Sequence, residues 1–299
     1  MKLFGTPLNP ALSFLAVVAT FVVLMPGSAR AGERLLATWG VSEVEGAGGG
    51  GLTPWATITG SGSSNQVGGS AFVTKTRTDG GYDLKVAGAA VGIHDRVELS
   101  IARWSFKLSD AVPGKALEMT VVGVKLKVAG DAVYDQDTWM PQISVGAQFK
   151  SNDDGDFVKA NLGAIRSSDL DVYASATKLW LGAAAGYNVL GNLTLRLTRA
   201  NQFGLIGFGG QGHDNRELMV EGSLGVMPRD DLVLGVEYRS KPNNLEATAA
   251  ILKEEAAWDL FVAWFPCRHV SLTAGWLELG NIAGKKDQQG VYLSGQAVF

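Results

Sequence analysis

The sequence has one cysteine, Cys267, and three histidines. One thiol cannot close a disulfide within the chain, and neither a CxxCH haem motif nor a CxxC pair of metal ligands occurs. The histidines do not stand at metal-ligand spacing. We therefore predict no metal site and no cofactor.

Long apolar runs are missing after residue 25. The run at residues 11–25 (ALSFLAVVATFVVLM) follows Lys2 and precedes an A-x-A cleavage pattern at residues 29–31. This arrangement predicts a secretory signal peptide over residues 1–31, cleaved after Ala31. Nowhere in the remaining chain do 18 apolar residues follow one another, so no transmembrane helix is predicted.

Neither sign of charge dominates, and proline is ordinary at 9 residues. Without Lys2 and Arg30, 24 basic groups stand against 29 acidic groups, a net charge of −5. This balance gives no reason to expect nucleic acid as a partner. Glycine is frequent at 39 residues, and glycine-rich chains with many short apolar stretches favour all-β folds.

Apolar and polar residues alternate with a period of two along most of the chain. In residues 232–239 (LVLGVEYR) every second residue is apolar, and residues 121–128 and 193–198 follow the same rule. Aromatic residues such as Trp258 stand at the ends of the apolar faces, as in the girdles of membrane barrels. The last strand ends on Phe299, which is typical of bacterial outer-membrane proteins. We predict a transmembrane antiparallel up-and-down β-barrel, placed in the cell outer membrane.

Strand counting gives an odd number. Fifteen segments alternate, among them 52–60, 156–166, 171–178 and 179–189, whereas bacterial single-chain barrels have even counts. We predict about 14 strands, with 12 as the next choice, over residues 66–299. The glycine-rich residues 32–65 are expected to form either a partial plug or a first strand. The end that carries Phe299 is expected to face the periplasm, together with short turns at 190–192, 227–230 and 266–269.

Charged residues on the polar faces are the main functional candidates. If they line an aqueous pore, their field sets ion preference, and the presence of both signs predicts weak selectivity. The equal alternative is that they pair with one another and stiffen or close the lumen. The predicted lumen-lining residues are Lys85, Glu98, Lys125, Lys127, Arg196, Glu217, Glu221, Glu237, Arg239, Asp259 and Glu278.

Three other patterns are weak. Residues 46–51 and 207–212 match GxGxxG but open no helix, so we interpret them as loop or plug glycines. The acidic residues 152–156 lack EF-hand spacing and are interpreted as a hairpin loop rather than a calcium site. His269 and Ser271 share a strand face, as in outer-membrane phospholipases, but lack a third orienting group. No enzymatic activity is predicted.

Several phrases of the sequence resemble a known family. They are residues 95–100 (DRVELS), 204–210 (GLIGFGG), 237–245 (EYRSKPNNL), 258–266 (WDLFVAWFP), 269–279 (HVSLTAGWLEL) and 289–299 (QGVYLSGQAVF). Together they are similar to an uncharacterised proteobacterial family of outer-membrane barrels, defined as a domain of unknown function. The resemblance covers nearly all of the mature chain. It implies the fold and the location, and it brings neither a substrate nor catalytic residues.

The preferred functional hypothesis is a porin-like channel that passes small polar solutes. The alternatives are a structural or binding barrel with a filled lumen, a lipid-modifying enzyme that would use Ser271, and a soluble periplasmic β protein. The expected partners are outer-membrane lipid and the barrel-assembly machinery, which would read the last strand at Phe299. The identity of the solute and the oligomeric state stay open.

Overall fold

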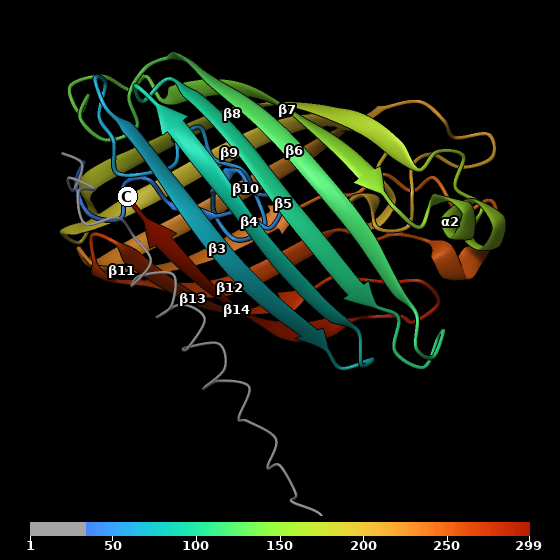
Figure 1. Cartoon of the computed structure of the whole chain (residues 1–299). Helices are drawn as coiled ribbons and strands as arrows, with labels where there is room; N and C mark the ends of the chain where they lie inside the picture. Colours follow the sequence, from blue (N-terminus) through green and yellow to red (C-terminus); the bar gives the residue numbers. More distant parts are fainter. Residues whose placement is uncertain (1–33) are drawn as a thin grey trace, which may run out of the picture.

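Twelve antiparallel strands close into one barrel in the computed structural model, which describes residues 34–299. Each strand pairs with its neighbours in sequence, and β14 pairs with β3 to close the wall (Figure 1). The wall strands are β3 (Val67–Thr78), β4 (Asp83–Ile93), β5 (Val97–Lys107), β6 (Ala116–Ala129), β7 (Gln142–Asn152), β8 (Ser168–Ala184), β9 (Tyr187–Thr198), β10 (Glu217–Arg229), β11 (Leu232–Arg239), β12 (Ala257–Cys267), β13 (Val270–Glu278) and β14 (Gln289–Val298). The predicted signal peptide, residues 1–31, lies outside the described residues.

The prediction of 14 strands is wrong, and the second choice of 12 is confirmed. Residues 52–60 lie inside the barrel and form no wall strand. The helix α2 (Gly155–Leu162) takes the place of the strand predicted at 156–166. Finally, residues 171–178 and 179–184 belong to the single long strand β8, because no turn separates residue 178 from residue 179. No helix among residues 34–299 is long and apolar enough to cross a membrane.

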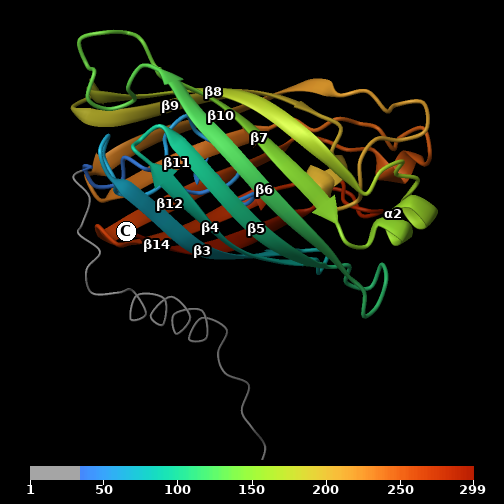
Figure 2. The same cartoon turned by 45° about the horizontal axis from the view of Figure 1, so that its top comes forward.

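The two rims of the barrel differ in the length of their connections. At the rim that holds the C-terminus, here the C-terminal rim, turns at 94–96, 185–186, 230–231 and 268–269 are short, and only the connection at 130–141 is long. The turn predicted at 190–192 lies within β9, and the chain instead reverses at 185–186. The opposite rim, here the α2 rim, carries α2 and longer loops that include η1 (Asn201–Gly204) and η2 (Ala250–Leu252) (Figures 1 and 2).

The outward face of the wall is apolar. Outward residues such as Leu193, Leu218 and Leu260 remain more than half exposed, because their side chains point away from the barrel. Aromatic residues, exposed or half-buried, mark both ends of this band. Trp180, Tyr187 and Trp264 lie near the C-terminal rim, whereas Tyr238 and the edge-to-face pair Trp258–Trp276, with ring centroids 4.9 Å apart, lie near the α2 rim. Such an apolar band between aromatic belts is the surface that a barrel presents to lipid.

Residues 34–65, here the luminal segment, lie inside the barrel (Figure 1, blue). The short strands β1 (Val41–Ser42) and β2 (Gly48–Gly49) form a small hairpin within it. Glycine is needed where the chain is tightly packed: a Cβ on Gly49 would lie 2.4 Å from the carbonyl oxygen of Thr53. Gly60 has a φ of +87°, which favours glycine, and its Cβ would meet the backbone of Gly69 at 2.5 Å.

Aromatic rings inside the wall lie over glycines of the neighbouring strand. Phe261 is paired in register with Gly235, and Tyr292 is paired with Gly275. A Cβ on Gly235 would lie 2.4 Å from Cζ of Phe261. The glycines therefore leave the space that the rings fill, and these cross-strand pairs hold the register of the sheet.

Gly235→Ala tests this packing. The added methyl group must displace the ring of Phe261, and overpacking of this kind costs about 1–3 kcal/mol. We expect a lower melting temperature of the folded barrel in detergent. The control is Gly222→Ala in β10, where the Cβ meets only a carbonyl oxygen of Asn192 at 3.3 Å. Equal melting temperatures for the two variants would contradict the proposed role of the ring.

Candidate functional site

A cluster of buried charges joins the luminal segment to the wall. The carboxylate of Glu45 lies 2.9 Å from Nη2 of Arg239 and 3.3 Å from Nη1 of Arg196, and it accepts a hydrogen bond from Nζ of Lys150. Asp171 pairs with Lys150 at 2.7 Å. None of these five side chains is exposed by more than 3%. Protein atoms therefore fill the lumen at this level.

The two carboxyl groups of the luminal segment respond differently to this environment. Burial and the charge of Glu45 raise the pKa of Glu43 well above its usual range, although Arg239 lies 3.2 Å away. Burial opposes the ionisation of Glu45 as well, but Arg239, Lys150 and Arg196 outweigh it and hold the pKa of Glu45 well below its usual range. Glu45 is therefore the ionised member of the pair.

A second contact fixes the backbone of the luminal segment. Glu98 of β5 accepts hydrogen bonds from the amides of Gly48 at 2.9 Å and Thr59 at 2.8 Å. Lys125 of β6 forms an ion pair with Glu98 at 3.1 Å and donates to the carbonyl oxygens of Gly48 at 2.8 Å and Trp55 at 3.1 Å. One buried ion pair thus satisfies backbone groups of β2 and of the residues that follow it.

A third contact lies on the opposite side of the lumen. Glu237 of β11 accepts hydrogen bonds from the amide of Leu52 and the hydroxyl of Thr53, both at 2.7 Å. Ser223 of β10 donates to Glu237 at 2.7 Å and accepts from the indole of Trp55 at 2.9 Å. The wall therefore holds the segment from both sides through groups that would otherwise be buried without partners.

A loop from the α2 rim meets the luminal segment at the same cations. Lys150 donates to the carbonyl oxygen of Phe203 at 3.2 Å, and the guanidinium of Arg239 lies 4.5 Å from the centre of the Phe203 ring. Gln202 and Phe203 have φ values of 44° and 63°, a left-handed conformation that costs on the order of 1–3 kcal/mol for each residue. Both carboxylate oxygens of Glu254 accept from the amide of Gln202, at 3.1 and 2.9 Å, and stabilise this turn.

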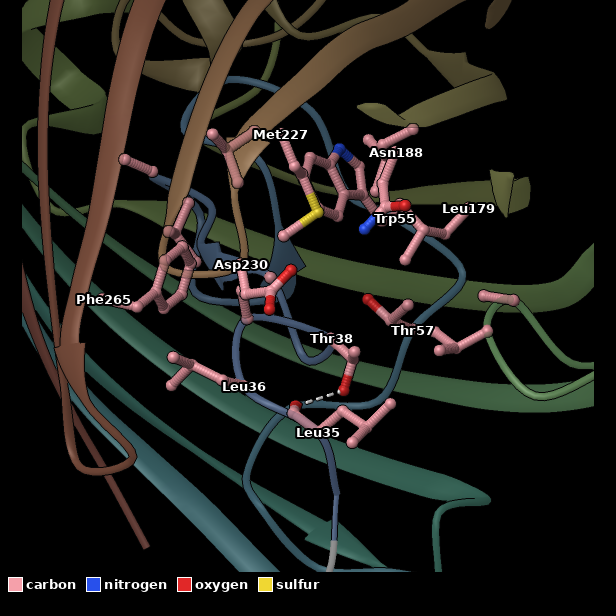
Figure 3. A pocket seen from close by; sticks show the side chains of 18 of the residues that line it. Leu35, Leu36, Thr38, Trp55, Thr57, Leu179, Asn188, Met227, Asp230 and Phe265 are labelled. Atoms are coloured by element: carbon pink, nitrogen blue, oxygen red, sulfur yellow. Dashed lines mark hydrogen bonds between the residues drawn. The ribbon is translucent and has the colours of Figure 1, made fainter. Parts of the chain in front are cut away.

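The space between the luminal segment and the C-terminal rim is an apolar cavity of about 550 Å³. Figure 3 shows Leu35, Leu36, Leu179, Met227 and Phe265 around it. This volume is within the range of ligand pockets, and apolar lining with few polar groups is their usual composition. A smaller cavity of about 70 Å³ lies on the other side of the charged cluster.

Most of the predicted lumen-lining charges do point inward. Arg196 pairs with Glu221 at 2.5 Å, and Lys127 pairs with Asp95 at 2.7 Å near the C-terminal rim. The inward-facing members of the predicted set are Glu98, Lys125, Lys127, Arg196, Glu217, Glu221, Glu237, Arg239 and Asp259. Of these, Glu217 is half-buried at the α2 rim, Lys127 is half-buried at the other rim, and the rest are buried.

Two of the predicted lumen-lining residues lie on the outward face of the wall instead. Lys85 is exposed on the outward face of β4, opposite Lys75 of β3. The alternation of β4 could not show this, because small and apolar residues occupy both of its faces. Glu278 pairs with Trp258 and therefore lies outward, on the same side as Trp276. Since residues two apart share a face, the position of Trp276 already indicated this orientation.

His269 and Ser271 do not form a catalytic pair. The hydroxyl of Ser271 donates to Gln296 at 2.8 Å, whereas Nδ1 of His269 lies 3.0 Å from the carbonyl oxygen of Val298. Phe299 follows directly and exchanges backbone hydrogen bonds with Gly69, at 2.7 and 3.0 Å. The end of the chain is thus fixed to the start of β3.

The acidic residues at 152–156 are occupied by cations of the protein itself. Asp153 pairs with Arg103 at 2.5 Å, and Asp154 forms an ion pair with Lys115. The two glycine-rich stretches serve as backbone elements: 46–51 belongs to the β1–β2 hairpin, and 207–212 bridges to Arg166.

Sequence reasoning missed four members of the charged cluster: Glu43, Glu45, Lys150 and Asp171. Lys150 had a usable signal, because Gln142, Ser144, Gln148 and Lys150 alternate with apolar residues along β7. Glu43 and Glu45 had none, since their partner Arg239 is almost 200 residues away and alternation does not describe a segment inside a barrel.

The buried carboxyl group of Glu254, which binds the turn at Gln202, makes the stability of the protein depend on pH. Burial raises the pKa of Glu254 to about 7, from an ordinary value of about 4.3. The folded protein therefore holds a proton there that the unfolded chain has released. This contribution to stability is fully present below pH 4 or so and is lost as the pH rises through 7.

We expect the melting temperature to fall between pH 5 and pH 7.5 and to fall less in Glu254→Gln, which cannot release that proton. Glu255→Gln, at the exposed neighbouring position, serves as the control and should behave as the unchanged protein does. Parallel pH profiles for Glu254→Gln and the unchanged protein would contradict the assignment.

Several solved outer-membrane barrels are similar to this chain at low sequence identity. The Acinetobacter baumannii outer membrane protein Omp33 is 7% identical over 79% of this chain and 100% of that chain, with a TM-score of 0.46. The KdgM porin is 9% identical over 77% and 99%, with a TM-score of 0.47. The NanC porin is 11% identical over 76% and 98%, with a TM-score of 0.48.

No curated protein sequence matches the chain significantly. A family model matches residues 38–296, which include most of the luminal segment as well as all but the last residues of the barrel. The luminal segment and the wall are therefore parts of one family domain. The chain belongs to the family described as "Protein of unknown function (DUF3034)".

Proposed function

We propose that the protein is a porin-like channel of the outer membrane for small polar solutes, closed in the described state by its own luminal segment. The observation that carries this proposal is the buried cluster around Glu45, in which the segment supplies the carboxylate and the wall supplies Arg239, Arg196 and Lys150. The side chains of the wall hold the segment through ion pairs and hydrogen bonds and not through a covalent cross-link. The segment can therefore be held in the lumen and also be released from it.

The proposed orientation places the C-terminal rim in the periplasm and the α2 rim outside the cell. The short turns of the first rim and the longer loops of the second support this orientation, since outer-membrane barrels have short periplasmic and long external connections. The exposed apolar band between two aromatic belts supports insertion in a membrane. The predicted signal peptide at residues 1–31, with its cleavage after Ala31, would bring the chain to the periplasm.

Weak selectivity is proposed for the open state. Withdrawal of the luminal segment would leave a wall with Lys125, Lys150, Arg196 and Arg239 against Glu98, Asp171, Glu221, Glu237 and Asp259. These charges nearly balance, and each of the four cations lies 3.3 Å or less from a wall carboxylate, so their fields largely cancel along the axis. Small polar solutes of either charge would then pass.

Glu43→Gln/Glu45→Gln tests the closure. Loss of the Glu45 carboxylate leaves three buried cations with only Asp171 and Glu221 to balance them, which destabilises the closed state by about 3–5 kcal/mol. In planar bilayers, we expect the fraction of time in conducting states to rise at least about tenfold over the unchanged protein. The control is Glu246→Gln/Glu255→Gln, which makes the same pair of substitutions at exposed loop positions of the α2 rim.

A second variant lacks residues 34–62 and should conduct in long-lived steps, provided that heat-modifiable gel mobility shows a folded barrel. Folded variants of both kinds that never conduct would refute the channel. Equal conduction by the unchanged protein and both variants would show instead that the luminal segment does not close the lumen.

The apolar cavity supports a second candidate function, a barrel that binds an apolar ligand at its C-terminal rim. The volume of about 550 Å³ and the lining by residues such as Leu179 and Met227 are the observations in its favour. A fluorescent apolar probe, N-phenylnaphthylamine, should bind the folded protein and should bind Leu179→Gln and Met227→Gln more weakly. Leu279→Gln, at the smaller cavity of the other end, should leave the affinity unchanged. Equal affinities in all variants would rule this candidate out.

A further inference from the structure

The charges on the outward wall are gathered on one side of the barrel. Near the α2 rim, the outward positions of β3, β4 and β5 carry four cations, here the outer basic patch: Lys75, Arg77, Lys85 and Lys107. By contrast, the outward positions of the described strands β7 to β14 carry charge only at Lys178, which is buried by carbonyl oxygens of the connection at 130–141, and at strand ends, at Glu278 and Arg229. A wall that faces lipid has no general need for such a cluster.

The register of the strands places these cations next to one another. Lys75 stands directly opposite Lys85. Asp83 is paired with Arg77 on one side and with Lys107 on the other, and its carboxylate lies 3.6 Å from Nζ of Lys75. Like charges directly opposite one another on adjacent strands repel. One carboxylate among four cations leaves the patch with an excess of positive charge.

Other outward cations of the same wall do have partners. Arg103, also on β5, lies 3.5 Å from Glu118 and 2.5 Å from Asp153. Within residues 34–299, no carboxylate lies within 4.0 Å of the cationic groups of Arg77, Lys85 or Lys107. The chain thus pairs two outward cations of these strands, Lys75 and Arg103, with its own acids and leaves three for a partner outside the chain.

The depth of the patch in the wall indicates what that partner is. Lys85 lies two residues from the start of β4 and Lys75 three residues from the end of β3, so both are within about 10 Å of the α2 rim. Lysine and arginine at such depths extend their apolar stems along lipid and place their charges at the headgroups. The acceptors found there are phosphate groups, which bind lysine and arginine through charge-assisted hydrogen bonds.

We propose that the outer basic patch is a binding site for the phosphate groups of a phosphorylated glycolipid in the outer leaflet. The leaflet follows from the proposed orientation of the barrel, whereas the affinity for phosphate does not depend on channel activity. A bound phosphate lies between Lys75 and Lys85 and changes their repulsion into a bridge. Arg77 and Lys107 supply the flanking donors.

The test uses the folded mature protein in neutral detergent and measures binding of diphosphoryl lipid A, with dephosphorylated lipid A for comparison. We expect diphosphoryl lipid A to bind at least about tenfold more tightly. Lys75→Ser/Lys85→Ser should abolish that preference. Lys253→Ser/Lys286→Ser removes the same charge from exposed loops of the α2 rim and should retain it.

Thermal unfolding gives a second measurement, in which one substitution should change the melting temperature in opposite directions with and without the phosphorylated lipid. Without phosphorylated lipid, Lys85→Ser removes a repulsion and should raise the melting temperature, whereas with diphosphoryl lipid A it should lower it. A preference that survives in Lys75→Ser/Lys85→Ser would overturn the site. Tighter binding of phosphatidylglycerol than of lipid A, or competition by millimolar inorganic phosphate, would overturn the assignment to an outer-leaflet glycolipid.

Discussion

The rest of the structure depends on the burial of one negative charge, that of Glu45. Its carboxylate meets cations from three wall strands: Arg239 of β11, Arg196 of β9 and Lys150 of β7. An unpaired carboxylate at this place would be excluded by its desolvation cost, and the three cations without the carboxylate would repel one another. The luminal segment and the wall therefore each supply the charge that the other part needs for burial. Phe203, in a loop of the α2 rim, contacts the same cations. The luminal segment and this loop therefore close the lumen together at the level of the charged cluster.

The charged cluster also divides the interior into two apolar compartments. The larger one opens toward the C-terminal rim, and the smaller one lies beneath the loops of the α2 rim. A solute that crosses the barrel has to pass the cluster, where the wall side chains Arg239 and Lys150 donate hydrogen bonds to the luminal segment. Movement of the segment is thus the step that would control passage. The apolar compartments would determine which molecules can bind on either side of the cluster.

The sequence predicted the barrel and most of its inward charges, because alternation reports directly which residues share a face. Glu98, Lys125 and Glu237 were found in this way. Alternation failed where both faces look alike, as at Lys85, and where a helix has an alternating sequence, as in α2. It could not place Glu45 against Arg239, since that contact joins distant parts of the chain and depends on the closed shape of the wall. Closure of a sheet is a property of the whole chain, which local patterns do not contain.

Hydrogen–deuterium exchange of the luminal segment tests the central claim most directly. The amides of Gly48, Leu52, Ala56 and Thr59 donate to wall side chains at 2.7 to 2.9 Å. If the segment is held in the lumen, peptides that cover residues 40–60 should exchange as slowly as the wall strands, and Glu43→Gln/Glu45→Gln should accelerate their exchange more than that of the wall. Exchange as rapid as that of the exposed loop residues 136–139 in the unchanged protein would contradict the account.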